Sequence, residues 1–469
     1  MIIESVRKFI SLKLIPPSNP IDIAGFIANL CVPNTTAIAN AKKVLGNSIF
    51  TLGKTIEKQE NNTYKKNCAH CLKIEFKVRV KLLSSQQMFF MTEIPVKDIK
   101  MVDLATQYQR LKPQIDSAMQ KVLDETSFIS GPAVKNFSQE LASYLDVKYV
   151  IPCANGTDAL QIALMALNLE PGDEVITSAF TFIATAEVIV LLGLKPVFVD
   201  VDSSDFTINV DQIANAITSK TKVILPVHLF GQCSNMEAIL KLAAEKNIHV
   251  VEDTAQAIGA EYTFIDGSKK RAGTMGSIGT TSFFPSKNLG CFGDGGALMT
   301  NDKELADLCT QIANHGSRVR YYHDVVGINS RLDSLQAAVL SEKLKHLNDF
   351  SARRNKAAKF YDEAFQGLSE VKTPGRIKNS THVFHQYTLQ ILNGKRDELK
   401  SYLEKKGIPA MVYYPLPLHQ QNVFKGVMTD VKLPITEKLA EQVLSLPMHT
   451  ELSDEQLNYI CASVKEFFK

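Results

Sequence analysis

One lysine of this chain stands where its amine could carry out chemistry. Lys287 follows the apolar run 280–286, and the glycine-dense stretch 290–296 comes shortly after it. An ammonium group held beside a buried strand loses hydration, so its pKa falls and the neutral amine can attack a carbonyl carbon. Lys287 is therefore a candidate for Schiff-base chemistry, although an isolated lysine at a strand end more often extends its amine into solvent.

An aspartate at the end of another apolar run gives this amine a partner. Asp253 ends the hydrophobic stretch 247–253 and precedes small residues. Such a run predicts a buried parallel strand, and ligands of open α/β sheets bind at the carboxyl ends of these strands. The alternatives are a helix N-cap and a metal site, which the lack of nearby ligand clusters in the sequence disfavours. A Schiff-base lysine and an acidic partner for a pyridinium nitrogen are what pyridoxal 5'-phosphate requires, so we predict this cofactor and no metal.

Six short stretches together carry a resemblance to a known family. They are residues 103–108, 154–160, 179–186, 252–256, 282–287 and 327–333. Their order and spacing resemble the DegT/DnrJ/EryC1/StrS nucleotide-sugar aminotransferases from about Met101 onwards, over nearly four fifths of the 469 residues. The resemblance implies an α/β enzyme of fold type I of the pyridoxal-phosphate-dependent transferases, which is the aspartate-aminotransferase fold. We expect a large domain with a mostly parallel sheet and a smaller C-terminal α+β domain.

Further cofactor-binding positions follow from the motifs. Gly156 and Thr157 open a helical pattern, so the backbone can approach an anion while the helix N-terminus and the hydroxyl donate to it. In the family that the chain resembles, this threonine contacts the cofactor phosphate, and Ser282 matches a second phosphate hydroxyl. Phe182 matches the ring that stacks on the pyridine, and Gln256 matches the residue that binds the ring hydroxyl. Without the resemblance, a helix start, a strand serine and a core phenylalanine would be the default readings.

The substrate side of the site is also expected from the resemblance. Asn329 matches an asparagine that reaches across a subunit boundary to the phosphate, and Arg331 matches an arginine near the substrate. A homodimer with shared active sites is therefore expected, with a helix cap and a surface arginine as alternatives. Tyr413, Tyr414 and His419 lie in a segment that relatives bring close to the sugar nucleotide.

The resemblance implies the reaction as well. Lys287 would hold the cofactor, and an amino group would pass from a donor, glutamate by analogy, to a keto nucleotide sugar in two half-reactions. The stretches 153–167 and 446–449 are most similar to the branch that aminates UDP-2-acetamido-2-deoxy-3-oxo-glucuronate for O-antigen and lipopolysaccharide synthesis. A dTDP-linked 3- or 4-keto-6-deoxyhexose is the alternative substrate. A non-catalytic regulator that binds the cofactor is the alternative from another class, and the joint presence of Lys287 and Asp253 disfavours it.

Composition fits an ordinary enzyme of the cytoplasm. The formal net charge is +3, from 52 Lys and Arg against 49 Asp and Glu. This balance argues against a nucleic-acid or membrane-surface partner and in favour of small-molecule substrates. The eight cysteines are scattered, and their usage suits reduced thiols.

The elements that must position these residues are predicted from hydrophobic periodicity. Strand patterns at 173–177, 195–201, 221–227 and 248–252 alternate with helical patterns at 158–167, 184–192, 211–218 and 236–245. This alternation predicts right-handed crossovers and a mostly parallel sheet covered on both faces. We expect a leader of unknown role and little ordered structure at 1–95, a large domain at 96–340 and a small domain at 341–469. The small domain should contain a strand at 385–391 and helices at 396–406 and 453–468.

Overall fold

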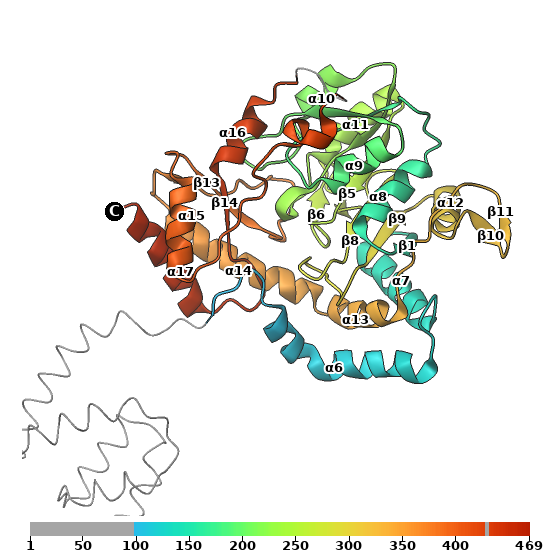
Figure 1. The fold of residues 1–469 in the computed structure, drawn as a ribbon, viewed down its shortest axis with the longest axis horizontal. Helices are drawn as coiled ribbons and strands as arrows, with labels where there is room; N and C mark the ends of the chain where they lie inside the picture. The colour runs from blue at the N-terminus through green and yellow to red at the C-terminus, as the bar shows by residue number, and fades with distance from the viewer. Residues whose placement is uncertain (1–97, 427–430) are drawn as a thin grey trace, which may run out of the picture. The chain divides into compact units, whose positions relative to one another are not determined.

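A seven-stranded sheet lies at the centre of the structure, a computed structural model that describes residues 98–426 and 431–469 (Figure 1). In spatial order the strands are β1 (Tyr149–Cys153), β9 (Gly296–Thr300), β8 (Ile278–Ser282), β5 (His249–Asp253), β4 (Thr221–Leu225), β2 (Glu174–Ser178) and β3 (Lys195–Val199). β9 runs antiparallel to both of its neighbours, and the other adjacent pairs are parallel. The mostly parallel sheet is thus confirmed. The predicted leader, 1–95, lies outside the described residues.

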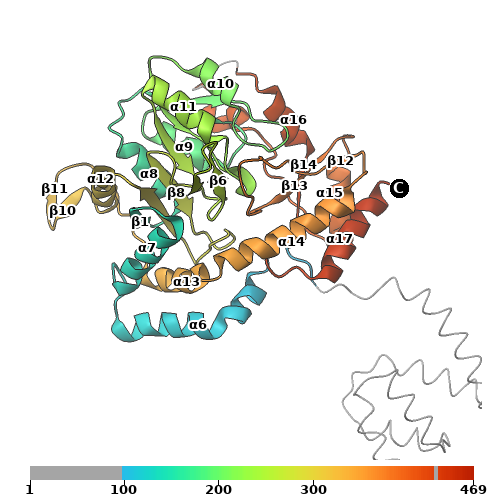
Figure 2. The ribbon, with the colours of Figure 1, turned by 180° about the vertical axis from the view of Figure 1, so that it is seen from behind.

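Helices cover both faces of this sheet (Figures 1 and 2). One face carries α8 (Gly156–Met165), α9 (Ala184–Leu191) and α12 (Lys303–Ala313), and the opposite face carries α10 (Val210–Ala216) and α11 (Met236–Lys246). Side chains of a strand alternate between faces. Val251 of β5 accordingly packs with residues of α8, whereas its neighbour Val250 packs with residues of α11. The same alternation decides which side chains at the end of β5 can reach a ligand.

A third group of helices packs beside the end of the sheet formed by β1 and β9. It contains α6 (Leu104–Glu125), α7 (Pro132–Leu145) and α13 (Ser334–Leu344), whose buried side chains share a core with Met299 of β9. In Figure 1, α6 runs along the outer side of α13, and the hairpin of β10 (Ser317–Val319) and β11 (Tyr322–His323) projects beyond α12. A second hairpin pairs β6 (Glu261–Thr263) with β7 (Lys269–Arg271).

The C-terminal part is built around a small antiparallel sheet. Its strands are β12 (Val371–Lys372), β13 (Tyr387–Ile391) and β14 (Val443–Leu446). They pack with α14 (Leu347–Phe365), α15 (Arg396–Lys405) and α17 (Asp454–Phe467) around a separate core. The helix α16 (Pro434–Gln442) and the short helices η3 (Leu229–Gly231), η4 (Leu418–Gln420) and η5 (Asn422–Phe424) complete the described elements. The predicted boundary between the large and the small domain, at residue 340, falls inside α13. The residues described from 98 onwards form one compact unit, and the boundary stays a prediction.

The predicted strands and helices of the parallel region are confirmed to within a few residues, as are β13, α15 and α17. Five cysteines of the described residues are free and buried. Within the described ranges, no helix combines the length and the apolar character needed to cross a membrane.

Candidate active site

The candidate site lies where two neighbouring parallel strands end. Asp253 is the last residue of β5, and Ser282 is the last residue of β8, so both side chains stand at the same edge of the sheet. The helix α8 begins there with Gly156. A Cβ atom at Gly156 would lie 2.7 Å from the Cβ atom of Ser282, so a glycine is required at this position for the helix end and the strand end to meet.

The start of α8 and the end of β8 form a cradle for an anion. Asn155 caps the helix, since its side-chain oxygen accepts a hydrogen bond of 2.8 Å from the amide of Asp158. The first-turn N–H groups of Gly156 and Thr157 point out of the helix end, where the helix dipole favours negative charge. The Thr157 hydroxyl makes no hydrogen bond with another described residue, and Ser282 Oγ only accepts, from the amide of Phe284 at 3.2 Å. These free donors fit a phosphate group.

The carboxylate of Asp253 is held in one orientation. Its Oδ2 accepts a hydrogen bond of 2.9 Å from the hydroxyl of Thr185 on α9, and its Oδ1 accepts one of 3.1 Å from the amide of Ala255. The side chain is buried. The sequence did not indicate a role for Thr185, although this residue lies in the motif stretch 179–186, because only the packing of α9 against the sheet brings it to Asp253.

Lys287 lies in the loop after β8, close to Asp253. The loop turns back there, with the amide of Lys287 donating to the carbonyl of Phe284 at 2.8 Å. Burial lowers the pKa of Lys287 from its ordinary 10.5 to about 8, while the nearby Asp253 charge acts in the opposite direction. The predicted desolvation of this amine and its proximity to Asp253 are both present in the structure.

The remaining predicted cofactor residues form the wall next to this pair. Gln256 accepts a hydrogen bond of 2.8 Å from the amide of Phe230 through Oε1, and its Nε2 donates to the hydroxyl of Tyr414 at 3.0 Å. The ring of Phe182, 55% exposed, lies 6.5 Å from the ring of Tyr414. Tyr413 and Tyr414 contact one another edge to face. The exposed Phe182 ring leaves a face for a planar ligand to stack on.

Asn329 and Arg331 both face away from the protein's own core. They are exposed and flank the buried Ser330, whose Oγ accepts a hydrogen bond of 3.0 Å from the amide of Ala154. Arg331 lines a cavity of about 840 Å³ together with Arg318 and other residues around the projecting hairpin. Side chains that point outward in this way are available to a second molecule.

Two histidines lie near the site region: His419, which was predicted from the sequence, and His385, which was not. The imidazole of His419 hydrogen-bonds Glu437 at 3.1 Å with its side chain only 4% exposed, and its expected approach to the sugar nucleotide stays a prediction. His385 is buried, and its Nδ1 lies 3.2 Å from Oδ1 of Asn288. Burial holds the pKa of His385 far below its ordinary value, and the nearby charge of Lys287 acts in the same direction. No sequence pattern indicated that His385 would lie near Lys287, because nearly one hundred residues separate the two.

Comparison of the chain with known proteins identifies its family. The model of the DegT/DnrJ/EryC1/StrS aminotransferase family matches residues 109–465. A "pleiotropic regulatory protein" of Geobacillus stearothermophilus is 48% identical over 79% of this chain and 99% of its own length. The UDP-2-acetamido-2-deoxy-3-oxo-D-glucuronate aminotransferase of Pseudomonas aeruginosa is 45% identical over 78% of this chain and 99% of its own.

Two solved structures have a fold similar to that of this chain. A DegT/DnrJ/EryC1/StrS aminotransferase from Brucella abortus is 40% identical with a TM-score of 0.75, over 79% of this chain and 99% of its own. DesV of S. venezuelae, in complex with a ketimine intermediate, is 38% identical with a TM-score of 0.76, over 79% of this chain and 98% of its own. The expected fold type I is confirmed. The chain belongs to the DegT/DnrJ/EryC1/StrS aminotransferase family.

Proposed function

We propose that this protein uses pyridoxal 5'-phosphate to transfer an amino group from glutamate to a keto nucleotide sugar, with UDP-2-acetamido-2-deoxy-3-oxo-glucuronate as the first candidate. The observation that carries the proposal is the desolvated amine of Lys287 beside Asp253, next to the cradle formed by Thr157 and Ser282. A relative, NtdA of Bacillus subtilis, has the cofactor PMP bound and is 33% identical with a TM-score of 0.71. Synthesis of a cell-surface polysaccharide such as O-antigen is the role that fits this substrate.

Each residue of the site has a task in this reaction. When bound, the cofactor supplies an electron-accepting ring for the bond that breaks at the amino-bearing carbon. Asp253 keeps a proton on the ring nitrogen, and Thr157 and Ser282 hold the phosphate. The amine of Lys287 would hold the cofactor and would move the proton to and from the substrate carbon. Phe182 and Gln256 fix the plane and the hydroxyl of the ring.

The comparisons and the charges near Arg331 support the substrate class. Besides the P. aeruginosa enzyme, a UDP-N-acetyl-3-dehydro-alpha-D-glucosamine 3-aminotransferase of Acidithiobacillus ferrooxidans is 44% identical. Arg331 makes no hydrogen bond or ion pair with another described residue, and Arg318 and Arg320 line the same cavity. Arg318 donates to Gln311 Oε1 at 2.9 Å, but none of the three guanidinium groups has a carboxylate partner among the described residues, and such groups favour the carboxylate and diphosphate of this substrate.

Two alternatives remain for the test. A dTDP-linked keto-deoxyhexose is the alternative substrate, because a dTDP-3-amino-3,4,6-trideoxy-alpha-D-glucose transaminase of Streptomyces venezuelae is 38% identical. A regulator that binds the cofactor without turnover is the alternative from another class, since the G. stearothermophilus relative carries a regulatory name.

The first prediction concerns where the cofactor is attached. Lys287 and Lys343 are both desolvated amines, and burial lowers the pKa of each to about 8. Only Lys287 has Asp253 beside it. Borohydride reduction of the purified protein followed by peptide mass spectrometry should therefore place the cofactor on the Lys287 peptide and none on the Lys343 peptide. Lys287→Ala should lose the attachment and lower turnover by at least roughly a hundredfold. Attachment elsewhere would contradict the proposal.

The second prediction concerns pH. With a pKa of about 8 instead of 10.5, roughly one Lys287 in ten is neutral at pH 7, against roughly three in ten thousand. The rate at which cofactor-free protein takes up the cofactor, followed by visible absorbance, should therefore rise with pH to a plateau, with a midpoint near pH 8.

Substitution of Asp253 should move this midpoint in a defined direction. The Asp253 charge raises the pKa of Lys287, so Asp253→Asn should shift the midpoint to lower pH. Asp307→Asn is the matched control, because that carboxylate pairs with Lys303 on the surface of α12. An unchanged midpoint in Asp253→Asn would show that the two groups do not interact.

The third prediction separates the candidate functions. Glutamate should convert the visible absorbance of the protein to that of the aminated cofactor, with formation of 2-oxoglutarate, whereas a regulator would leave it unchanged.

Among keto nucleotide sugars, the UDP-linked 3-oxo-glucuronate should restore the absorbance fastest. Arg331→Met should raise KM for this sugar more than for the UDP-N-acetyl-3-dehydro-glucosamine, which lacks the carboxylate. Faster reaction of the dTDP-linked sugars would favour the alternative substrate.

The fourth prediction tests whether two subunits share the site. If Asn329 serves the site of its partner, a hybrid of Lys287→Ala and Asn329→Ala chains contains one intact site. Mixing the two poorly active variants under subunit exchange should then restore up to about a quarter of the parent activity. Chains that carry both substitutions are the control, and mixing them with either single variant should restore no activity. No gain on mixing would place both residues in one subunit.

A further inference from the structure

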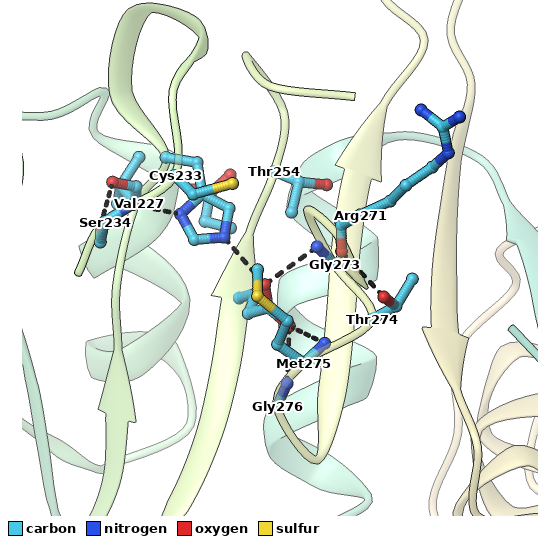
Figure 3. Close-up of polar contacts among 12 residues, drawn as sticks. Val227, Cys233, Ser234, Thr254, Arg271, Gly273, Thr274, Met275 and Gly276 are labelled. Carbon is cyan, nitrogen blue, oxygen red and sulfur yellow. Dashed lines mark hydrogen bonds and ion pairs between the residues drawn. The ribbon is translucent and has the colours of Figure 1, made fainter. Parts of the chain in front are cut away.

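A buried hydrogen-bonded pair lies directly behind the residue proposed to hold the ring nitrogen. His228 Nε2 and Glu252 Oε2 are 2.8 Å apart, and both side chains are fully buried. Glu252 precedes Asp253 in β5, and strand side chains alternate between faces. Asp253 therefore faces the side of α8, and Glu252 faces the side of α11, away from the ligand. Figure 3 shows the network on that side, with Ser234 and the turn at 273–276 around the pair.

Hydrogen bonds determine the protonation state of both partners. The amide of Ser234 donates to His228 Nδ1 at 3.1 Å, and because an amide N–H can only donate, Nδ1 must be unprotonated. The ring proton is therefore on Nε2 and is donated to Glu252. The carboxylate also accepts from the amides of Gly273, Met275 and Gly276, at 2.9, 2.7 and 2.6 Å. Burial raises the pKa of Glu252, but these donors outweigh it and leave the pKa below its ordinary value.

His228 closes the loop 228–234 at both of its ends. At one end the backbone amide of His228 donates to the carbonyl of Asp253 at 3.0 Å, and at the other end the imidazole Nδ1 accepts from the amide of Ser234, six residues further on, at 3.1 Å. Inside the loop, Phe230 and Gly231 adopt left-handed backbone conformations with φ of 57° and 119°. A non-glycine residue such as Phe230 disfavours this conformation, so surrounding contacts must hold it in place, among them the closing contacts and the bonds to the backbone of Val383 and Gln386.

The closed loop sets the orientation of Gln256. The amide of Phe230 donates to Gln256 Oε1 at 2.8 Å, which fixes which end of the side-chain amide faces the loop. The NH₂ group then points the other way, toward the hydroxyl of Tyr414 at 3.0 Å. A second hydrogen of this group remains free to donate to the ring oxygen of a cofactor.

We propose that His228 is a positioning residue for the pyridine-binding end of the site, because its imidazole closes the 228–234 loop so that Phe230 orients Gln256. The inference rests on the proposed cofactor site. It assigns a task to a histidine that touches no ligand, and it predicts that the loop contact of His228 counts for more than its contact with Glu252.

Two substitutions of His228 separate its contact with Ser234 from its contact with Glu252. His228→Asn keeps an acceptor near the place of Nδ1 and loses the donor to Glu252, whereas His228→Gln keeps a donor near the place of Nε2 and releases Ser234. In purified full-length protein, His228→Gln should lower the affinity for pyridoxal 5'-phosphate about tenfold and shift the absorbance maximum of the bound cofactor. His228→Asn should remain within about threefold of the parent.

A matched control removes general destabilisation from this comparison. Tyr361→Phe deletes another buried hydrogen bond, from the Tyr361 hydroxyl to the carbonyl of Pro447 at 2.9 Å, in the core of the C-terminal part. It should lower the midpoint of thermal unfolding and leave the cofactor affinity and absorbance unchanged. If His228→Gln behaves like Tyr361→Phe, the pair is merely structural and the proposal is overturned.

A double-mutant cycle tests the route through Gln256. If His228 acts through this side chain, His228→Gln should cause no further loss of cofactor affinity in a Gln256→Ala background, whereas additive losses would refute the route. Should His228→Gln fail to fold, Ser234→Ala takes its place in the cycle as a second way to loosen this end of the loop. It removes the hydroxyl bond of 3.1 Å to the carbonyl of Val227, the residue just before the loop, and keeps the amide that donates to Nδ1. A parent protein that binds no cofactor would instead contradict the proposed function, so the two failures are distinguishable.

Discussion

The removal of water from one amine is the constraint on which the rest of the structure depends. Lys287 is half-buried in the loop after β8, where desolvation of its amine lowers its pKa to about 8 and Asp253 limits how far this pKa falls. A fully buried, isolated lysine would shift further, and an exposed one would stay protonated. The two parallel strands, the capped start of α8 and the helices on both faces set this balance by fixing the ends of β5 and β8 side by side.

The two faces of the sheet divide the work at the end of β5. On the side of α8, Asp253 is held by Thr185 at the proposed cofactor site. On the side of α11, Glu252 is fully buried and accepts from four donors. Because one residue separates the two carboxylates, the alternation of a single strand gives one negative charge to the site and uses the other to anchor the loop behind it.

Much of this arrangement could be predicted from the sequence, because it depends on local patterns. Apolar runs located the parallel strands, and Asp253 was identified as a candidate directly from the end of one of them, whereas Ser282 was identified through the family resemblance. Contacts that join distant segments could not be foreseen. Thr185 reaches Asp253 only after α9 packs on the sheet, and His385 comes near Lys287 from the C-terminal part. The reversed direction of β9 also carries no local signature. The ligand roles of the individual residues stay predictions.

The five buried cysteines have a consequence for how this protein meets reactive chemicals. Burial raises the pKa of the thiols of Cys153, Cys233, Cys291, Cys309 and Cys461, so none of these five is poised as a nucleophile. Alkylating reagents attack thiolates, and these side chains become accessible only when their surroundings open. The rate at which iodoacetamide labels them in the native state therefore measures how often the interior is exposed to solvent.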